Sequence, residues 1–344
     1  MRRSVVCTFC LILALAALRT PAVADPVADF YRRRTITLII GYTVGGGYDV
    51  YGRVVARHMN KHIPGNPSIV VQNMPGAGSL RATNYLYNVA SRDGATMATV
   101  SRGMAIEPLI GASDTRFDPA RFAWLGSGTN EVSVCATVRD SPVRTWADML
   151  AKDFTVGGEG SASDPDIFSA VIKNVFGVRL RLVAGYPGGA EITLAMERRE
   201  VEGRCGWSYS SLKLQRPEWV AQKQINIPVQ LALEKSPELS DVPLIMDFAT
   251  TERQRQILRL VFSRQSMARP FVAPPGIPED RKQALRAAFD ETMADPEFLA
   301  EAKARGLEVN PVSGVDIDKL IRELYQTPAD VVAEVRATIA RGAK

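Results

Sequence analysis

The sequence has few of the residue types on which most catalytic and metal sites depend. Its 344 residues include two histidines, His58 and His62, and four cysteines. The histidines stand four positions apart, so one face of a helix would carry both. A zinc-protease helix would need glutamate directly after the first histidine, where Met59 stands. We therefore expect a solvated helix face here, and no bound metal or cofactor.

The cysteines are not spaced for metal or redox chemistry. Cys7 and Cys10 fall in an N-terminal leader, while Cys135 and Cys205 lie far apart in strand-like segments, with no CxxC pair. This last pair either forms a disulfide in an oxidising compartment or remains as two buried thiols. A bridge requires Cα atoms within about 7 Å of each other.

Long apolar runs are missing after the first 24 residues. The stretch 5–18 is apolar, follows two arginines and precedes Ala22-Val23-Ala24. This order is typical of a secretory signal peptide, and the run is too short to span a bilayer comfortably. We predict that residues 1–24 are removed, that the mature chain begins at Asp25 and that it lies in the periplasm. The alternative is a retained anchor, which an intact-mass measurement on native material would reveal.

Blocks of positive charge are also missing, so no nucleic-acid partner is expected. The formal net charge of the whole chain is +5. Arg2, Arg3 and Arg19 would leave with the leader and no acid would, so the mature chain lies nearer to neutrality.

What the sequence does contain is two blocks in which strands and helices alternate, the pattern of a parallel sheet. The predicted strands are 35–40, 68–72, 96–100, 154–157 and 180–184, and the predicted helices are 50–63, 80–89, 167–176, 191–198, 278–294, 315–324 and 329–341. Extended stretches at 131–138 and 268–273 would connect the blocks. We expect an α/β protein with a first lobe at 25–130, a second lobe at 131–266, and a return of 267–344 to the first lobe.

Four turns between a predicted strand and a predicted helix are rich in glycine: 45–49, 73–79, 157–163 and 185–190. Glycine lets backbone N–H groups approach a ligand closely, and a helix N-terminus favours an anion. Ligands of such sheets bind at the carboxyl ends of the strands. Two lobes that each carry two such turns would enclose a small anion between them.

The turns do not fit the common enzyme motifs. A phosphate-binding Walker loop needs Lys-Ser/Thr where Tyr48-Asp49 stand, and the dinucleotide fingerprint that begins at Gly76 has Arg81 in place of its third glycine. Ser161 lacks the G-x-S-x-G elbow of a hydrolase. We therefore expect no enzyme, and a hydrolase using Ser161 is the least favoured reading.

The chain resembles the Bug-type extracytoplasmic solute-binding receptors of the tripartite tricarboxylate transporter family, over nearly its whole mature length. The segments that carry the resemblance are 35–49, Val70-Val71-Gln72-Asn73-Met74-Pro75-Gly76-Ala77-Gly78, Arg92-Asp93-Gly94, Leu239-Ser240-Asp241-Val242-Pro243, 271–278, Asp295-Pro296-Glu297 and Gly306-Leu307-Glu308-Val309. The resemblance implies a two-lobed periplasmic-binding-protein-like fold of type II, with a hinge and a ligand cleft.

The resemblance also implies a carboxylate ligand held by backbone amides, hydroxyls and waters. The implied ligand-binding positions are Thr43, Gly46, Gly47, Tyr48, Asp49, Asn73, Gly76, Ala77, Gly78, Ser79, Gly160, Ser161, Ser163, Tyr186, Gly188, Gly189, Trp207 and Ser208. Trp207 either offers an aromatic surface to the ligand or lies in the core. Glu159 and Asp166 stand where relatives carry uncharged polar residues or histidine, which disfavours a multiply charged ligand such as citrate.

We expect the ligand carboxylate to sit where turn 45–47 meets turn 76–79, facing loop 158–163, and to be bound without arginine. Asp49 would point at backbone donors and fix its loop without touching the ligand. The predicted function is capture of a small organic carboxylate by a monomeric receptor, with delivery to integral membrane transporter subunits. The alternative is a ligand-sensing subunit of a membrane sensor system.

Overall fold

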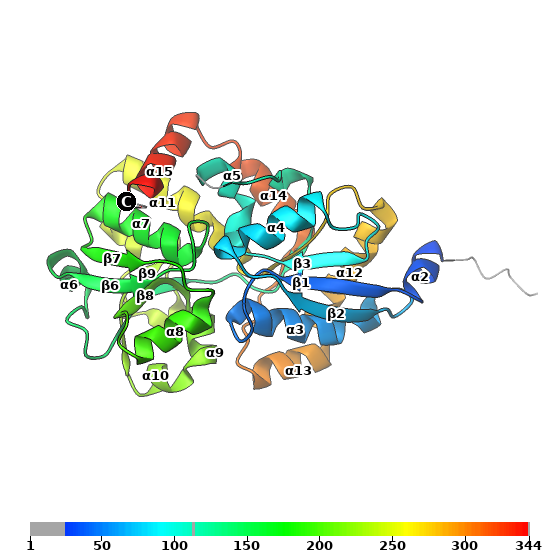
Figure 1. The fold of residues 1–344 in the computed structure, drawn as a ribbon, viewed down its shortest axis with the longest axis horizontal. Helices are drawn as coiled ribbons and strands as arrows, with labels where there is room; N and C mark the ends of the chain where they lie inside the picture. The colour runs from blue at the N-terminus through cyan, green and yellow to red at the C-terminus, as the bar shows by residue number, and fades with distance from the viewer. Residues whose placement is uncertain (1–24, 112–113, 343–344) are drawn as a thin grey trace, which may run out of the picture.

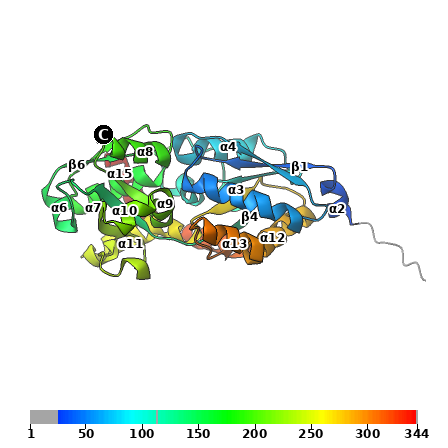
Figure 2. The same ribbon diagram turned by 90° about the horizontal axis from the view of Figure 1, so that it is seen from below.

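The computed structural model describes residues 25–111 and 114–342, arranged as two lobes (Figure 1). The predicted signal peptide, with Cys7 and Cys10, lies outside the described residues. Figure 2 shows the lobes side by side along the long axis of the molecule. Within the described ranges, no helix has the length and apolar character needed to cross a membrane.

The first lobe is built on a sheet of order β11-β4-β10-β3-β1-β2. Its strands are β1 (Thr35–Ile40), β2 (Ser68–Asn73), β3 (Thr96–Thr99), β4 (Ala123–Ser127), β10 (Pro270–Ala273) and β11 (Val312–Ser313). β1 pairs in parallel with β2 and β3, and β10 runs antiparallel between β3 and β4. The carboxyl ends of β1 and β2 therefore meet at one edge, where the first two glycine-rich turns begin.

Helices pack around this sheet and around one another. They include α2 (Pro26–Tyr31), α3 (Gly47–Met59), α4 (Leu80–Asn88), α5 (Glu107–Ile110), α12 (Glu279–Ala294), α13 (Pro296–Ala304) and α14 (Gly314–Leu324). In α3, Tyr51, Val54, Val55 and Met59 are buried at helical spacing. The helix predicted at 50–63 thus begins three residues earlier, and its last turn is the 3-10 helix Asn60–His62.

The second lobe has a sheet of order β7-β6-β8-β5-β9. Its strands are β5 (Ser133–Val138), β6 (Phe154–Gly157), β7 (Leu180–Val183), β8 (Gly203–Ser208) and β9 (Ile225–Leu231), and its helices include α6 (Trp146–Ala151), α7 (Asp164–Phe176), α8 (Gly189–Glu197), α9 (Tyr209–Gln215), α10 (Pro217–Ala221) and α11 (Glu252–Phe262). β6 pairs in parallel with β7 and β8, whereas β5 runs antiparallel between β8 and β9.

The chain passes between the lobes in two adjacent segments that hydrogen-bond to each other. Gly128 N donates to Arg269 O at 3.0 Å, and Ala268 N donates to Thr129 O at 2.9 Å. Glu131 N also donates to Gln265 O at 3.1 Å. This short two-stranded connection is the hinge of the fold, and it places Arg269 beside the cleft.

The last helix departs from the predicted return of 267–344 to the first lobe. α15 (Ala329–Gly342) lies against α7 and α11 of the second lobe (Figure 1). Its Val332 and Val335 are buried, and Asn174 Nδ2 donates to Thr338 O at 2.7 Å. The apolar face of α15 is buried on α7, and Arg336 of the same helix donates to Leu109 O of α5 in the first lobe at 2.7 Å, so α15 contacts both lobes.

Cys135 and Cys205 are neighbours on the paired strands β5 and β8. They form a disulfide with Cα atoms 3.8 Å apart, which confirms the predicted proximity of the two residues.

Candidate functional site

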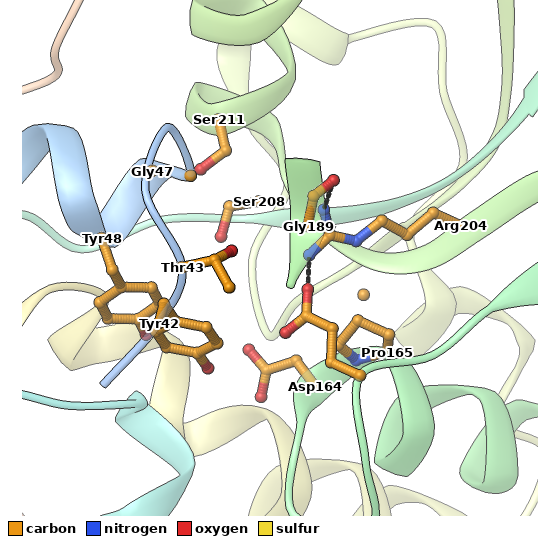
Figure 3. Close-up of a pocket in the computed structure, with 13 residues that line it drawn as sticks. Tyr42, Thr43, Gly47, Tyr48, Asp164, Pro165, Gly189, Arg204, Ser208 and Ser211 are labelled. Carbon is orange, nitrogen blue, oxygen red and sulfur yellow. Dashed lines mark hydrogen bonds and ion pairs between the residues drawn. The ribbon is translucent and has the colours of Figure 1, made fainter. Parts of the chain in front are cut away.

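A small cavity of about 40 Å³ lies between the two lobes (Figure 3). Its walls are Tyr42, Thr43, Gly46, Gly47, Tyr48, Glu159, Asp164, Pro165, Gly189, Arg204, Gly206, Ser208 and Ser211. Typical ligand pockets measure about 300–1,000 Å³, so the lobes are closed upon each other here. The cavity in this arrangement suits a group of a few atoms.

Two helices begin at the cavity wall, one from each lobe. Glycine occupies the N-cap of both: Gly46 before α3 and Gly188 before α8. No side chain of the described residues caps either helix start. The first N–H groups of a helix lack intrahelical partners and carry its partial positive charge. These ends therefore offer donors to an anion in the cavity.

Asp49 fixes the turn at the start of α3, and its side chain is 2% exposed. Its carboxylate accepts hydrogen bonds from Gly45 N at 3.0 Å, Arg53 Nε at 3.0 Å and Asn73 Nδ2 at 2.8 Å. Burial favours the neutral acid, but these donors together hold the pKa of Asp49 below its ordinary value. The carboxylate thus points at one backbone donor of its loop, as predicted, and also at two side-chain donors from α3 and the end of β2.

Two tyrosines and an arginine close the first-lobe side of the cavity. The rings of Tyr42 and Tyr48 stack with centroids 4.5 Å apart, and the guanidinium of Arg269 lies 4.8 Å from the Tyr48 centroid. The Tyr48 hydroxyl accepts from Arg102 N at 3.0 Å. Burial raises the pKa of both tyrosines, so their hydroxyls stay protonated at neutral pH.

Arg204 lines the cavity, and three further arginines contact residues of its wall. Each of the four is paired with an acid. Arg102 and Arg264 both bind Asp164, at 2.6 and 3.1 Å. Arg204 binds Glu159, and Arg269 binds Glu131 at 3.0 Å. Burial raises the pKa of Glu159 despite Arg204. The pKa of Asp164 is lowered, because its two arginines outweigh burial.

Asp166 organises the loop between β6 and α7. One carboxylate oxygen accepts from Glu159 N at 2.8 Å, Gly160 N at 3.1 Å and Ser163 Oγ at 2.7 Å. Burial raises the pKa of Asp166, and these three hydrogen bonds offset that effect only in part. The loop predicted to donate to the ligand is therefore engaged by an acid of the protein.

The cavity brings together only some of the predicted ligand-binding residues. Those that line it are Thr43, Gly46, Gly47, Tyr48, Gly189 and Ser208. Those that do not are Asp49, Asn73, Gly76, Ala77, Gly78, Ser79, Gly160, Ser161, Ser163, Tyr186, Gly188 and Trp207. Trp207 is fully buried in the core of the second lobe.

Turn 76–79 and loop 160–163 pack directly against each other. A Cβ at Gly78 would lie 2.5 Å from Ser163 N, and one at Gly160 would lie 3.1 Å from the Cα of Ala77. The two segments are in contact in this closed arrangement, and neither lines the cavity. The predicted meeting point of three turns stays a prediction. Arg204 forms part of the cavity wall but is paired with Glu159, so binding of the ligand without arginine stays a prediction.

The prediction missed Tyr42, Arg204 and Ser211 as cavity-lining residues. Arg204 could have been found, since it stands inside the buried stretch Gly203–Ser208, where a charge is costly without a partner. Ser211 carries no such signal. It reaches the cavity from α9, and a Cβ at Gly47 would lie 2.1 Å from its Oγ.

Sequence comparison finds no matching family model but does find relatives. The chain is 26% identical over 296 residues to a UPF0065 protein in the gbd 5' region of Cupriavidus necator, which covers 83% of this chain and 81% of that protein. A shorter match, 37% identical over 98 residues, is to protein BugT of Bordetella pertussis and covers 26% of this chain and 29% of BugT.

Solved structures share the fold. The periplasmic binding protein BugD matches with a TM-score of 0.70 at 17% identity, over 90% of this chain and 98% of BugD. MatC from Rhodopseudomonas palustris with bound malate matches with a TM-score of 0.69 at 17% identity, over 89% of this chain and 99% of MatC. The sequence relatives and the two-lobed fold together confirm the resemblance of this chain to the Bug-type solute-binding receptors of the tripartite tricarboxylate transporter family.

Proposed function

We propose that the mature chain is an extracytoplasmic solute-binding protein that captures a small organic carboxylate between its lobes and delivers it to a membrane transporter. The ligand would be bound and released unchanged. The relatives and structural neighbours named above support this proposal, since BugD is a periplasmic binding protein and MatC was solved with malate.

One observation carries the proposal for this chain: the start of α3 opens into the interlobe cavity. Gly46 and Gly47 form part of the wall, and the N-terminal amides of α3 are available as donors. Ser208 and Ser211 of the second lobe face the same cavity with hydroxyl groups. A carboxylate in this position would bridge a helix start of one lobe and hydroxyls of the other, and would favour the closed state.

The size of the cavity suggests how the ligand enters. A cavity of about 40 Å³ holds a carboxylate group but not a whole ligand of several carbons, so the lobes must separate at the hinge to admit it. Such hinge closure around a ligand is an established mode of domain motion.

A thermal-shift screen of the mature protein tests the proposal. The panel contains straight-chain, hydroxy- and amino-carboxylates of two to six carbons, each paired with its amide as a control without charge. A ligand that binds only the folded state raises the melting temperature. We expect at least one carboxylate to do so while its amide does not. The proposal fails if no carboxylate shifts the melting temperature, or if acid and amide act equally.

A further inference from the structure

Asp166 occupies, on the second lobe, the kind of position that a ligand carboxylate would take. One of its carboxylate oxygens accepts hydrogen bonds from two loop amides and from the Ser163 hydroxyl, all within 3.1 Å. Loop amides ahead of a helix N-terminus are a preferred anion site in α/β folds. Here the anion is a side chain of the protein, and Asp166 is only 8% exposed.

The other charges on this side of the cavity would not attract a second ligand anion. Glu159 and Asp164 are two acidic residues of the cavity wall. Arg204 is engaged by Glu159, and Asp164 is shared between two arginines. A further carboxylate brought to this wall would meet two acids and would have to compete with them for arginine.

The first lobe differs at the equivalent place. The Asp49 carboxylate accepts a hydrogen bond from only one backbone amide of its loop, that of Gly45. Its remaining donors are the side chains of Arg53 and Asn73. Within the described residues, no side-chain acceptor caps the start of α3.

The first amides of α8 are also uncapped by any of the described side chains, but Glu159 lies beside them, because Arg204 donates to both Gly189 O and Glu159. The start of α3 is therefore the position most open to a carboxylate, and the amides of loop 159–160 are already taken by Asp166.

We propose that Asp166 restricts the receptor to ligands that carry a single carboxylate, by holding the second-lobe donors that would otherwise take another. This inference rests on the proposed function and narrows its ligand class to monocarboxylates. The far end of the ligand would be uncharged or a hydrogen-bond donor, because it approaches Glu159 and Asp164.

Calorimetric titration with matched pairs of acids tests this inference. The pairs are propionate and malonate, butyrate and succinate, pentanoate and glutarate, and hexanoate and adipate. We expect the wild-type protein to bind the monocarboxylate of a pair at least about tenfold more tightly. In Asp166→Ala the amides of Glu159 and Gly160 are freed, and the preference should move by about tenfold or more toward the dicarboxylate.

Two further variants keep the test informative. Asp166→Asn retains an acceptor and removes the charge, so its preference should shift in the same direction by less. Asp148→Ala removes the capping-box acid at the start of α6, on the same lobe and away from the cavity. We expect it to affect stability and to leave the preference unchanged.

The outcomes separate this inference from the proposed function. Equal binding of both members of a pair by the wild-type protein would overturn the role of Asp166 alone. The role of Asp166 would also be overturned if Asp166→Ala weakened the binding of both acids of a pair by the same factor and Asp148→Ala did the same. The effect of the substitution would then be structural. Binding of neither series by the wild-type protein would count against the proposed function itself.

Discussion

At the scale of single residues, Asp49 holds three donors from three places in the first lobe: the turn before α3, the helix itself and the end of β2. Its direction could be predicted from the sequence, because an acid beside an anion site must turn away from the anion. Arg102, Arg264 and Arg269 could not be assigned in the same way. They are fully buried by lobes and hinge segments that are distant in sequence.

Replacing Asp49 tests whether its hydrogen bonds hold the turn before α3 in place. Asp49→Ala should lower the free energy of unfolding by about 1 kcal/mol or more, because three donors lose a charged acceptor, and should weaken ligand binding. Asp49→Asn should have a milder effect, because it keeps an acceptor for Gly45 N. Urea unfolding and calorimetry on both variants measure this. If Asn abolishes binding while the fold survives, Asp49 contacts the ligand and this description is wrong.

The same residue predicts a pH dependence. Because the pKa of Asp49 is lowered in the folded state, the unfolded chain binds the proton more readily, and the contribution of Asp49 to stability is lost as the pH falls through the folded pKa. The stability difference between wild type and Asp49→Asn should therefore be present at neutral pH and shrink below about pH 4. A difference that grows under acid would contradict the lowered pKa.

At the scale of elements, the sequence predicted the strands β1, β2, β3, β6 and β7 and the helices α3, α4, α7, α8, α12, α14 and α15, because their apolar residues follow the periods of a strand or a helix. It gave β5 and β10 only as extended stretches. β9 was missed, since Asn226, Pro228 and Gln230 interrupt its apolar pattern. The start of α3 was placed too late. Glycine is a poor helix former, and only the tertiary structure shows that Gly47 begins the helix.

The disulfide between β5 and β8 should stabilise the second lobe. It links cysteines 70 residues apart, and closing a loop of this kind typically contributes about 2–4 kcal/mol. We expect reductant to lower the urea midpoint of the wild-type protein. The double variant Cys135→Ala, Cys205→Ala should have a lowered midpoint that does not respond to reductant. An unchanged wild-type midpoint would mean that the bond contributes nothing to stability.

At the scale of the whole molecule, the lobes meet through a buried ion pair as well as through loops. Arg102 of the first lobe and Asp164 of the second lie 2.6 Å apart. The sequence predicted two lobes but not this contact, nor the packing of turn 76–79 on loop 160–163, because nothing local encodes how two lobes close. For the same reason it did not predict that α15 packs mainly on the second lobe.

The ion pair of Asp164 should stabilise the closed arrangement of the lobes. Asp164→Asn leaves Arg102 and Arg264 without their charged partner, and breaking a buried pair typically costs about 3–5 kcal/mol. Part of this cost can be relieved if the lobes open and water reaches the arginines. We expect a larger radius of gyration by X-ray scattering for the ligand-free variant than for wild type. Asp153→Asn, which breaks an exposed pair with Arg179 on the same lobe, is the matched control and should leave the radius unchanged.

The central claim is that a ligand carboxylate binds at the start of α3 between the closed lobes. A crystal structure of the mature protein with a ligand found in the thermal-shift screen tests it most directly. The account predicts a carboxylate oxygen about 2.7–3.2 Å from a backbone nitrogen in the stretch Gly46–Tyr48, with the second lobe closed over it. A ligand bound outside the cleft, or one whose carboxylate lies on the second-lobe loop in place of Asp166, would contradict the account.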